Sequence, residues 1–260
     1  EYMNKKSKTF LALILASIYR ASSQNFDLQG KNLNISFGIL WNLFKQVIII
    51  AGISFVFSVG LRGAGLRIEY LFFNLLFWFF FAEVVNTTVS LKIEKSYLFL
   101  NSINIYNFLF SHIFRLFIQW FILLLLSLMT FFILKLQIPV IKILYSFVGV
   151  AFLAQIYACI VSSILHDRDF LIELHQFFMQ ALFFASSTVV PISILPEEIR
   201  DILLYIPLVH LQEFIKSPVT GIELSYIDVT YPILFIIFGS VLVMPGLFFK
   251  GKRIYASIKR

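Results

Sequence analysis

Residues 69–90, EYLFFNLLFWFFFAEVVNTTVS, form an apolar run with carboxylates only at positions 69 and 83. A helix needs about 20 such residues to cross the hydrocarbon core of a bilayer. Backbone N–H and C=O groups in lipid must be paired within their own segment, so a helix is the expected structure for this run. The run therefore predicts a membrane-spanning helix.

The same pattern recurs along the chain. Five more apolar blocks reach a similar length, at residues 38–59, 107–134, 141–164, 174–194 and 229–249. None has the alternation that a barrel strand requires. With 60% hydrophobic and 13% charged residues, a water-soluble fold would have too little polar material for its surface. The sequence thus predicts an all-α, polytopic membrane protein with six transmembrane helices.

The basic residues predict the orientation of these helices. If the N-terminus is cytoplasmic, most of the 21 Lys and Arg residues fall on the cytoplasmic side, and the acidic residues gather on the other side, above all within 197–228. The positive-inside rule then places both termini in the cytoplasm. Anionic headgroups of the inner leaflet account for the net charge of +7, so we expect membrane lipids and no nucleic acid as partners.

Three segments outside the blocks have features of their own. Residues 7–35 are expected to hold an amphipathic helix on the inner membrane surface, with a cleaved secretory signal as the alternative. Residues 250–260 form a basic cytoplasmic tail. Between blocks five and six, the apolar stretch 202–211 is too short to span and is interrupted by Pro207. It predicts an outer re-entrant helical hairpin, or else a surface helix packed on the outer ends of the spans.

Polar side chains inside the blocks are costly in lipid and therefore informative. Glu83 is a candidate functional residue. The alternatives are a packing hydrogen bond to Asn86 or to a neighbouring helix, or a position near enough to the inner surface to be hydrated. Three glutamines are expected to bridge helices, namely Gln119, Gln155 and Gln180.

Catalytic and metal-binding motifs are weak in this chain. Asp167 and Asp169, beside His166, could hold an oxygen-preferring cation, which makes an integral-membrane glycan-modifying enzyme the alternative function from another class. A short acidic motif of this kind is more often a solvated turn. The glycine-bounded segment 246–253 ends in Arg where a phosphate-binding loop needs Ser or Thr. The single cysteine, Cys159, offers no disulfide. We predict no catalytic residue and no metal or cofactor site in this chain.

Five short segments resemble, in order, the permeases of ABC transporters that export polysaccharides. They are SFGILW at 36–41, NLLFW at 74–78 followed by Glu83, Arg168-Asp169, SSTVVP at 186–191, and IPLVH at 206–210. The chain departs from the family at Ile206, where Asn usually precedes the proline, and at Lys45, near a position where proline is common. The resemblance covers nearly the whole chain, so residues 1–260 are expected to form a single transmembrane permease domain, with the bundle at 38–249.

The resemblance implies a transport subunit and not an enzyme. Two copies would form the pore as a homodimer, and two separate nucleotide-binding ATPase subunits would supply ATP and Mg²⁺. The substrate would be a polysaccharide, with capsular polysaccharide favoured and O-antigen or teichoic acid as alternatives; a lipid anchor and periplasmic export partners are left open. The location implied is the bacterial cytoplasmic (inner) membrane.

The resemblance also assigns roles to residues. The substrate path would include residues of the second block, which are Tyr70, Phe73, Phe77, Trp78, Phe81 and Glu83. The alternative is that rings in this aromatic-rich chain face lipid or pack between helices, and Tyr70 also suits an interfacial belt. Coupling to the ATPase would use residues of the inner loops, which are Lys92, Glu94, Lys95, Ser96, Tyr97, Arg168 and Asp169. An outer gate would include Pro207 and His210.

Overall fold

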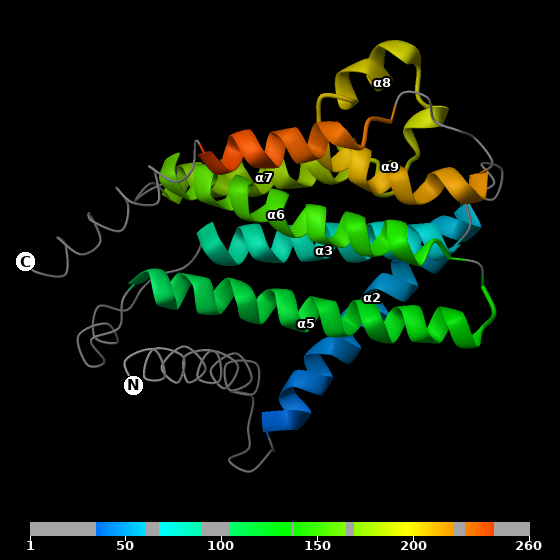
Figure 1. The fold of residues 1–260 in the computed structure, drawn as a ribbon, viewed down its shortest axis with the longest axis horizontal. Coiled ribbons are helices and arrows are strands. Elements are labelled where there is room, and N and C mark those ends of the chain that lie inside the picture. Colours follow the sequence, from blue (N-terminus) through cyan, green and yellow to red (C-terminus); the bar gives the residue numbers. More distant parts are fainter. Residues whose placement is uncertain are drawn as a thin grey trace, which may run out of the picture. The chain divides into compact units, whose positions relative to one another are not determined.

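A computed structural model describes residues 35–60, 68–89, 105–136, 138–164, 169–220 and 227–241. Within these ranges the chain forms helices and turns and no strand, which confirms the all-α class. The helices are α2 (Ile35–Gly60), α3 (Ile68–Val89), α5 (Ile105–Ile133), α6 (Val140–Ile164), α7 (Asp169–Ala185), η2 (Ile192–Ile194), α8 (Glu197–Leu203), α9 (Pro207–Thr220) and a helix at Thr230–Val241 (Figure 1).

Three helical segments are long and apolar enough to cross a membrane. They are Ile68–Asn86, Leu116–Ile133 and Val140–Val161, and shorter apolar helices occur at Phe44–Gly60 and Thr230–Val241. These segments support a membrane protein. The full count of six spans stays a prediction, and the regions 7–34 and 250–260 lie outside the described residues.

The chain divides into two compact units. The first comprises residues 1–49, 92–127 and 254–260, and the second comprises residues 50–91 and 128–253. In the first unit, Phe117 and Phe121 lie one helical turn apart on α5 and stack with ring centroids 5.9 Å apart. The second unit holds α3, α6, α7, α8, α9 and the helix at Thr230–Val241.

The core of the second unit forms where α3 packs along α6 and α9 packs against both. Phe80 stacks on Phe147 with ring centroids 4.8 Å apart, and Phe81, the next residue on α3, contacts Tyr157, further along α6, at 5.7 Å. Phe77, earlier on α3, also reaches Phe147, at 6.2 Å. Residues later in α3 thus contact residues later in α6, so the two helices run in the same direction.

Two more helices flank α6 in the second unit. On α7, His175 contacts Tyr157 and Phe183 contacts Trp78, so α7 runs opposite to α3 and α6. The helix at Thr230–Val241 runs parallel to α6, because Tyr145 Oη donates to the Val229 carbonyl at 3.2 Å and Ile156, further on, abuts Gly239. These directions are the ones expected of the second, fourth, fifth and sixth predicted spans.

The fifth block folds differently from its prediction as one run at 174–194. Its helix, α7, begins at Asp169 and ends at Ala185, and a turn then leads to η2. Three consecutive hydroxyl residues, Ser186, Ser187 and Thr188, follow the helix and form hydrogen bonds with the backbone, with each other and with α9. Such hydrogen bonds compete with those of a continued helix, and the apolar composition of the block did not indicate them.

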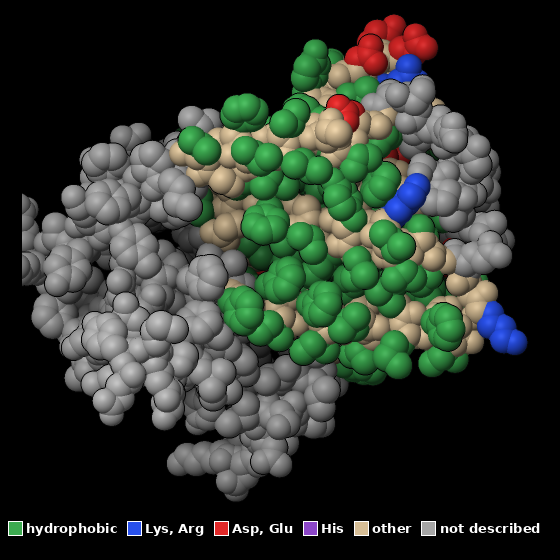
Figure 2. Space-filling view, in the orientation of Figure 1, with side chains coloured by type: hydrophobic (Ala, Val, Ile, Leu, Met, Phe, Trp, Pro, Cys, Tyr) green, Lys and Arg blue, Asp and Glu red, His purple; other side chains and the backbone are tan. Residues whose placement is uncertain are grey.

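The surface agrees with contact to lipid. Figure 2 shows a face of the described residues that is covered largely by hydrophobic side chains, while carboxylates gather around α8. Among the most exposed apolar side chains are Phe132, Ile141 and Phe170. Such extensive apolar exposure is unusual for a soluble monomer and is the rule where lipid is the solvent.

Candidate functional site

The end of α7 is a sharp turn built from polar residues. The Ser186 amide closes the last helical turn on the Leu182 carbonyl at 2.8 Å, and Ser187 then adopts a φ of 63°, in the left-handed region. A residue with a Cβ in that region costs on the order of 1 kcal/mol or more and persists only where its surroundings hold it. The surroundings that hold Ser187 come from α9.

Glu213 on α9 is the residue that holds this turn. Its side chain is 1% exposed, and one carboxylate oxygen, Oε1, accepts hydrogen bonds from the Ser187 hydroxyl and from the Ile192 backbone N–H, the latter at 3.2 Å. A buried carboxylate is costly unless hydrogen bonds replace its lost hydration. Glu213 therefore fixes both the end of α7 and the start of η2 to α9.

Gln212 extends this arrangement into a buried polar network, defined here as Ser186, Ser187, Thr188, Gln212 and Glu213. The Gln212 amide donates to the Thr188 hydroxyl at 3.1 Å, and the Thr188 and Ser186 hydroxyls lie 2.7 Å apart. All five side chains are at most 1% exposed. Because three of these residues lie in the turn after α7 and two lie on α9, the buried polar network fixes the crossing of α9 over the end of α7.

The opposite side of α9 is held by α6. The Ser146 hydroxyl donates to the Leu211 carbonyl at 2.8 Å, and a Cβ built at Gly149 would lie only 2.8 Å from Leu211 Cδ1. A glycine at this position lets the two helices approach closely, as small residues commonly do in membrane proteins. Thus α9 is clamped between α6 and the buried polar network.

The predicted outer-gate residues both lie on α9. Pro207 is its first residue, a position where the missing N–H has no intrahelical partner to lose, and it separates α8 from α9 as its position in the apolar stretch 202–211 predicted. His210 is buried and hydrogen bonds to Leu204 and Asp228. Whether these helices re-enter a membrane, and whether they gate a path, stay predictions.

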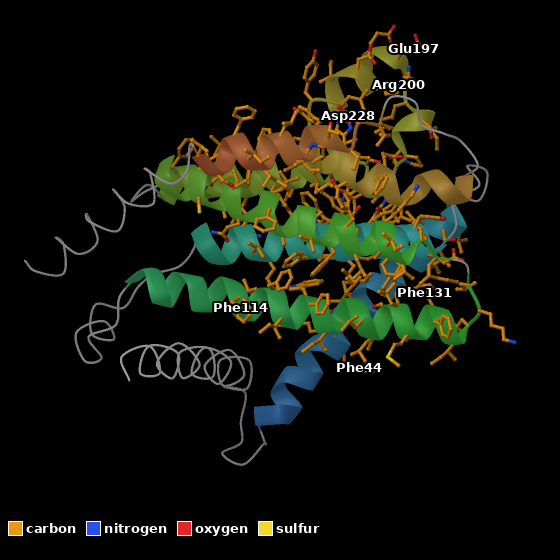
Figure 3. The ribbon with its side chains drawn as sticks, in the orientation of Figure 1. Phe44, Phe114, Phe131, Glu197, Arg200 and Asp228 are labelled. Carbon is orange, nitrogen blue, oxygen red and sulfur yellow. The ribbon has the colours of Figure 1, made fainter. Side chains whose placement is uncertain are left out.

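Asp228 lies two residues before the helix at Thr230–Val241, and Figure 3 labels it together with Glu197 and Arg200, which form an ion pair on α8. The Thr230 hydroxyl and amide donate to Asp228 Oδ1 at 2.7 and 2.8 Å. These hydrogen bonds hold the pKa of the Asp228 carboxyl below its ordinary value. The carboxylate thus serves as a cap for the first turn of this helix.

The predicted path residues of α3 lie in the helical core. Phe73, Phe77, Trp78 and Phe81 are buried and pack on rings of neighbouring helices, at Phe131, Phe147, Phe183 and Tyr157 respectively. Tyr70 is also buried, and Glu83 is half-buried. In a single copy these rings fill space between helices, and their role in a substrate path stays a prediction.

An exposed face of α7 shows the opposite arrangement. Phe170, Phe177 and Phe184 are 73%, 69% and 67% exposed, and they recur at a spacing of two helical turns. Beside them runs an exposed polar stripe at three- and four-residue spacing, made of Glu173, Gln176 and Gln180. We call these six residues the α7 face. The sequence analysis missed it, although the spacing of its polar residues was a readable signal.

The glutamines expected to bridge helices differ in their surroundings. Gln180 is exposed on the α7 face, so it does not bridge helices among the described residues. Gln155 donates to Cys159 Sγ within its own helix, at 3.2 Å. Gln119 is half-buried in α5, and its Nε2 has no hydrogen-bond partner among the described residues.

Several predicted residues lie outside the described residues. They are Lys92, Glu94, Lys95, Ser96, Tyr97, Asp167 and Arg168. Asp169 is the first residue of α7. Within the ranges that the structure covers, no group of three His, Cys, Asp or Glu side chains could hold a metal ion.

No protein-family model matches this chain, and no curated protein matches it either.

Proposed function

We propose that this chain is the transmembrane subunit of an ABC transporter that exports a polysaccharide across the cytoplasmic membrane. The observation that carries the proposal is the α7 face, where exposed amides and a carboxylate alternate with exposed phenyl rings. The five segments that resemble polysaccharide-exporting permeases point to the same class of substrate.

In this proposal Gln180 of the α7 face lies within the membrane, where hydrocarbon would be a poor solvent for its amide. Gln180 lies between His175 and Phe183, whose rings contact Tyr157 and Trp78. Both contacted residues belong to segments apolar enough to span a membrane. Polar side chains at such a position are unfavourable in hydrocarbon and normally face a water path or another protein chain.

The chemistry of the α7 face suits a glycan. Sugar rings present hydroxyl groups at their rims and C–H groups on their faces. The amides of Gln176 and Gln180 can exchange hydrogen bonds with the hydroxyls, while Phe177 and Phe184 can contact the C–H faces. Neither kind of contact is strong or selective, which lets a long polymer slide without a deep binding well.

A second copy of the chain would complete the path. In one copy the α7 face is open, so two copies related by a twofold axis can enclose a polar conduit between them. ATP hydrolysis in the partner subunits would shift the copies between closed and open packings. The segment 92–97 is the proposed ATPase contact, and the favoured substrate is a capsular polysaccharide.

Export can be tested in cells whose own copy of the gene has been deleted. Gln180→Leu removes the central amide of the α7 face, and Met129→Leu changes an exposed apolar residue of α5 as the matched control. We expect Gln180→Leu to reduce surface polysaccharide several-fold at unchanged membrane abundance, and Met129→Leu to leave it unchanged. Equal export by both variants would contradict a path along α7.

Purification tests whether the chain binds an ATPase subunit. The tagged full chain, extracted in mild detergent, should recover an ATPase subunit, and the complex should hydrolyse ATP in a vanadate-sensitive manner. Recovery without any nucleotide-binding subunit would contradict the transporter class. Glycan turnover by the purified chain alone would instead favour the enzyme built on Asp167 and Asp169.

A further inference from the structure

His210 uses both of its ring nitrogens. Nε2 lies 2.8 Å from the Leu204 carbonyl oxygen, and Nδ1 lies 3.1 Å from the Asp228 backbone nitrogen. A carbonyl can only accept a hydrogen bond, so Nε2 must carry a proton. A backbone N–H can only donate, so Nδ1 must present a lone pair. The two bonds together require the neutral imidazole with its proton on Nε2.

These bonds join segments that are distant in sequence. Leu204 lies in the turn between α8 and α9, whereas Asp228 precedes the helix at Thr230–Val241. The His210 ring also contacts the Tyr231 ring, with centroids 5.1 Å apart, and the Tyr231 hydroxyl donates to the Tyr205 carbonyl at 2.9 Å. A single imidazole of α9 thus ties the turn at 204–205 to the segment at 228–231.

We propose that His210 is a proton-sensitive latch, which holds the turn at 204–205 to the segment at 228–231 while its ring is neutral and releases that segment when its ring is protonated. Protonation places a second N–H on Nδ1, directly facing the Asp228 N–H. That hydrogen bond is lost, and two donors then oppose each other. The bond from Nε2 to Leu204 survives, so the release is confined to the 228–231 side.

Several titratable groups surround His210. The titratable side chains on α9 and on the elements packed against it include Asp228, Tyr231, Lys142, Tyr145, Glu69, Asp201, Tyr205 and Glu213. Of these, the Asp228 carboxylate interacts electrostatically with the His210 ring. Glu213 is held by Ser187, and Lys142 lies over the Phe214 ring at 4.7 Å. The His210 ring itself is 5% exposed.

The latch rests on the fold of residues 197–220 and 227–241 and not on the proposed transport function. Amide hydrogen exchange tests it on the full chain in lipid nanodiscs at pH 7.5 and 5.5, with rates corrected for intrinsic exchange. The Asp228 amide should exchange about fivefold faster at the lower pH, the factor expected when one net hydrogen bond is lost. In His210→Gln, which cannot titrate, the corrected rate should not depend on pH.

Tyr231→Phe is the matched control. It removes the bond to the Tyr205 carbonyl at every pH, so it should raise exchange equally at both values and retain the pH-dependent step. A wild-type rate that does not change with pH, or the same change in His210→Gln, would overturn the proposal.

Nitrogen NMR of histidine-labelled protein gives a second measurement that does not depend on a folded variant. The His210 signals should report the Nε2–H tautomer at pH 7.5 and the imidazolium at pH 5.5. A ring that remains neutral at pH 5.5, or that shows the Nδ1–H tautomer at pH 7.5, would also overturn it.

Discussion

α3 and α7 carry similar phenyl rings and expose them in opposite ways. Phe77 on α3 is fully buried between helices, whereas Phe177 on α7 is 69% exposed. The sequence around Phe77 is apolar apart from Asn74, while the sequence around Phe177 contains a polar stripe. Thus the number of aromatic residues says little about a conduit, and their polar neighbours on the same helix say more.

The largest expected effect tests this contrast directly. Phe77→Ala should lower the free energy of unfolding by about 3 kcal/mol, because it leaves a cavity where α3 meets α6. Phe177→Ala should change it by less than about 0.5 kcal/mol, because the ring has few neighbours to lose. Reversible unfolding in mixed micelles measures both values. Similar losses for the two variants would show that the α7 face is covered within one copy.

The helical class and several boundaries could be predicted from sequence because they depend on local chemistry. Apolar runs of sufficient length must pair their backbone groups as helices, and Pro207 marks the start of α9 because proline suits a first helical turn. In α3 the apolar residues surround the helix, so their periodicity could not show which rings face inward.

The buried polar network could not be predicted in the same way. Ser187 and Glu213 are 26 residues apart in sequence, and only the tertiary fold brings them together. Glu213 reads as an ordinary acidic residue of an outer loop until α9 is placed against the end of α7. The α7 face differs from both cases, since Glu173, Gln176 and Gln180 share a helical spacing that sequence alone displays.

The second-largest effect is expected at the turn after α7, which Glu213 ties to α9. Glu213→Ala should lower the free energy of unfolding by about 2 kcal/mol, because the Ser187 hydroxyl and the Ile192 N–H lose their buried acceptor. Glu213→Gln keeps an oxygen acceptor at that place, so it should lower the free energy of unfolding by less. The same micelle titration compares them, and equal losses would indicate that the charge, not the acceptor, stabilises the turn after α7.

A smaller effect is expected where α9 meets α6. Gly149→Ala places a methyl group against Leu211, whose side chain is 1% exposed and has little room to move, so a loss of about 1 kcal/mol is expected. Gly52→Ala on α2 is the matched control, because a Cβ there would meet nothing within 4 Å. The control should be neutral or stabilising, since alanine is the better helix former. If both substitutions were neutral, the approach of α9 to α6 would not be limited by Gly149.

The smallest effect is expected at the fully exposed Asp228, outside both regions of the comparison. Hydrogen bonds from Thr230 lower the pKa of the folded carboxyl below its ordinary value of 3.8, so its contribution to stability is present above that pH. The contribution is lost as the pH falls through the lower, folded pKa, because the protonated carboxyl accepts these bonds weakly. Thr230→Val removes the hydroxyl donor, so the stability difference from wild type should be constant above about pH 5 and shrink below the ordinary value. A difference that persists unchanged at pH 2.5 would mean that Thr230 stabilises the helix at Thr230–Val241 by packing alone. In that case the Asp228 carboxylate would contribute nothing to the start of the helix, and the structural role of Asp228 would reduce to the backbone N–H that it donates to His210.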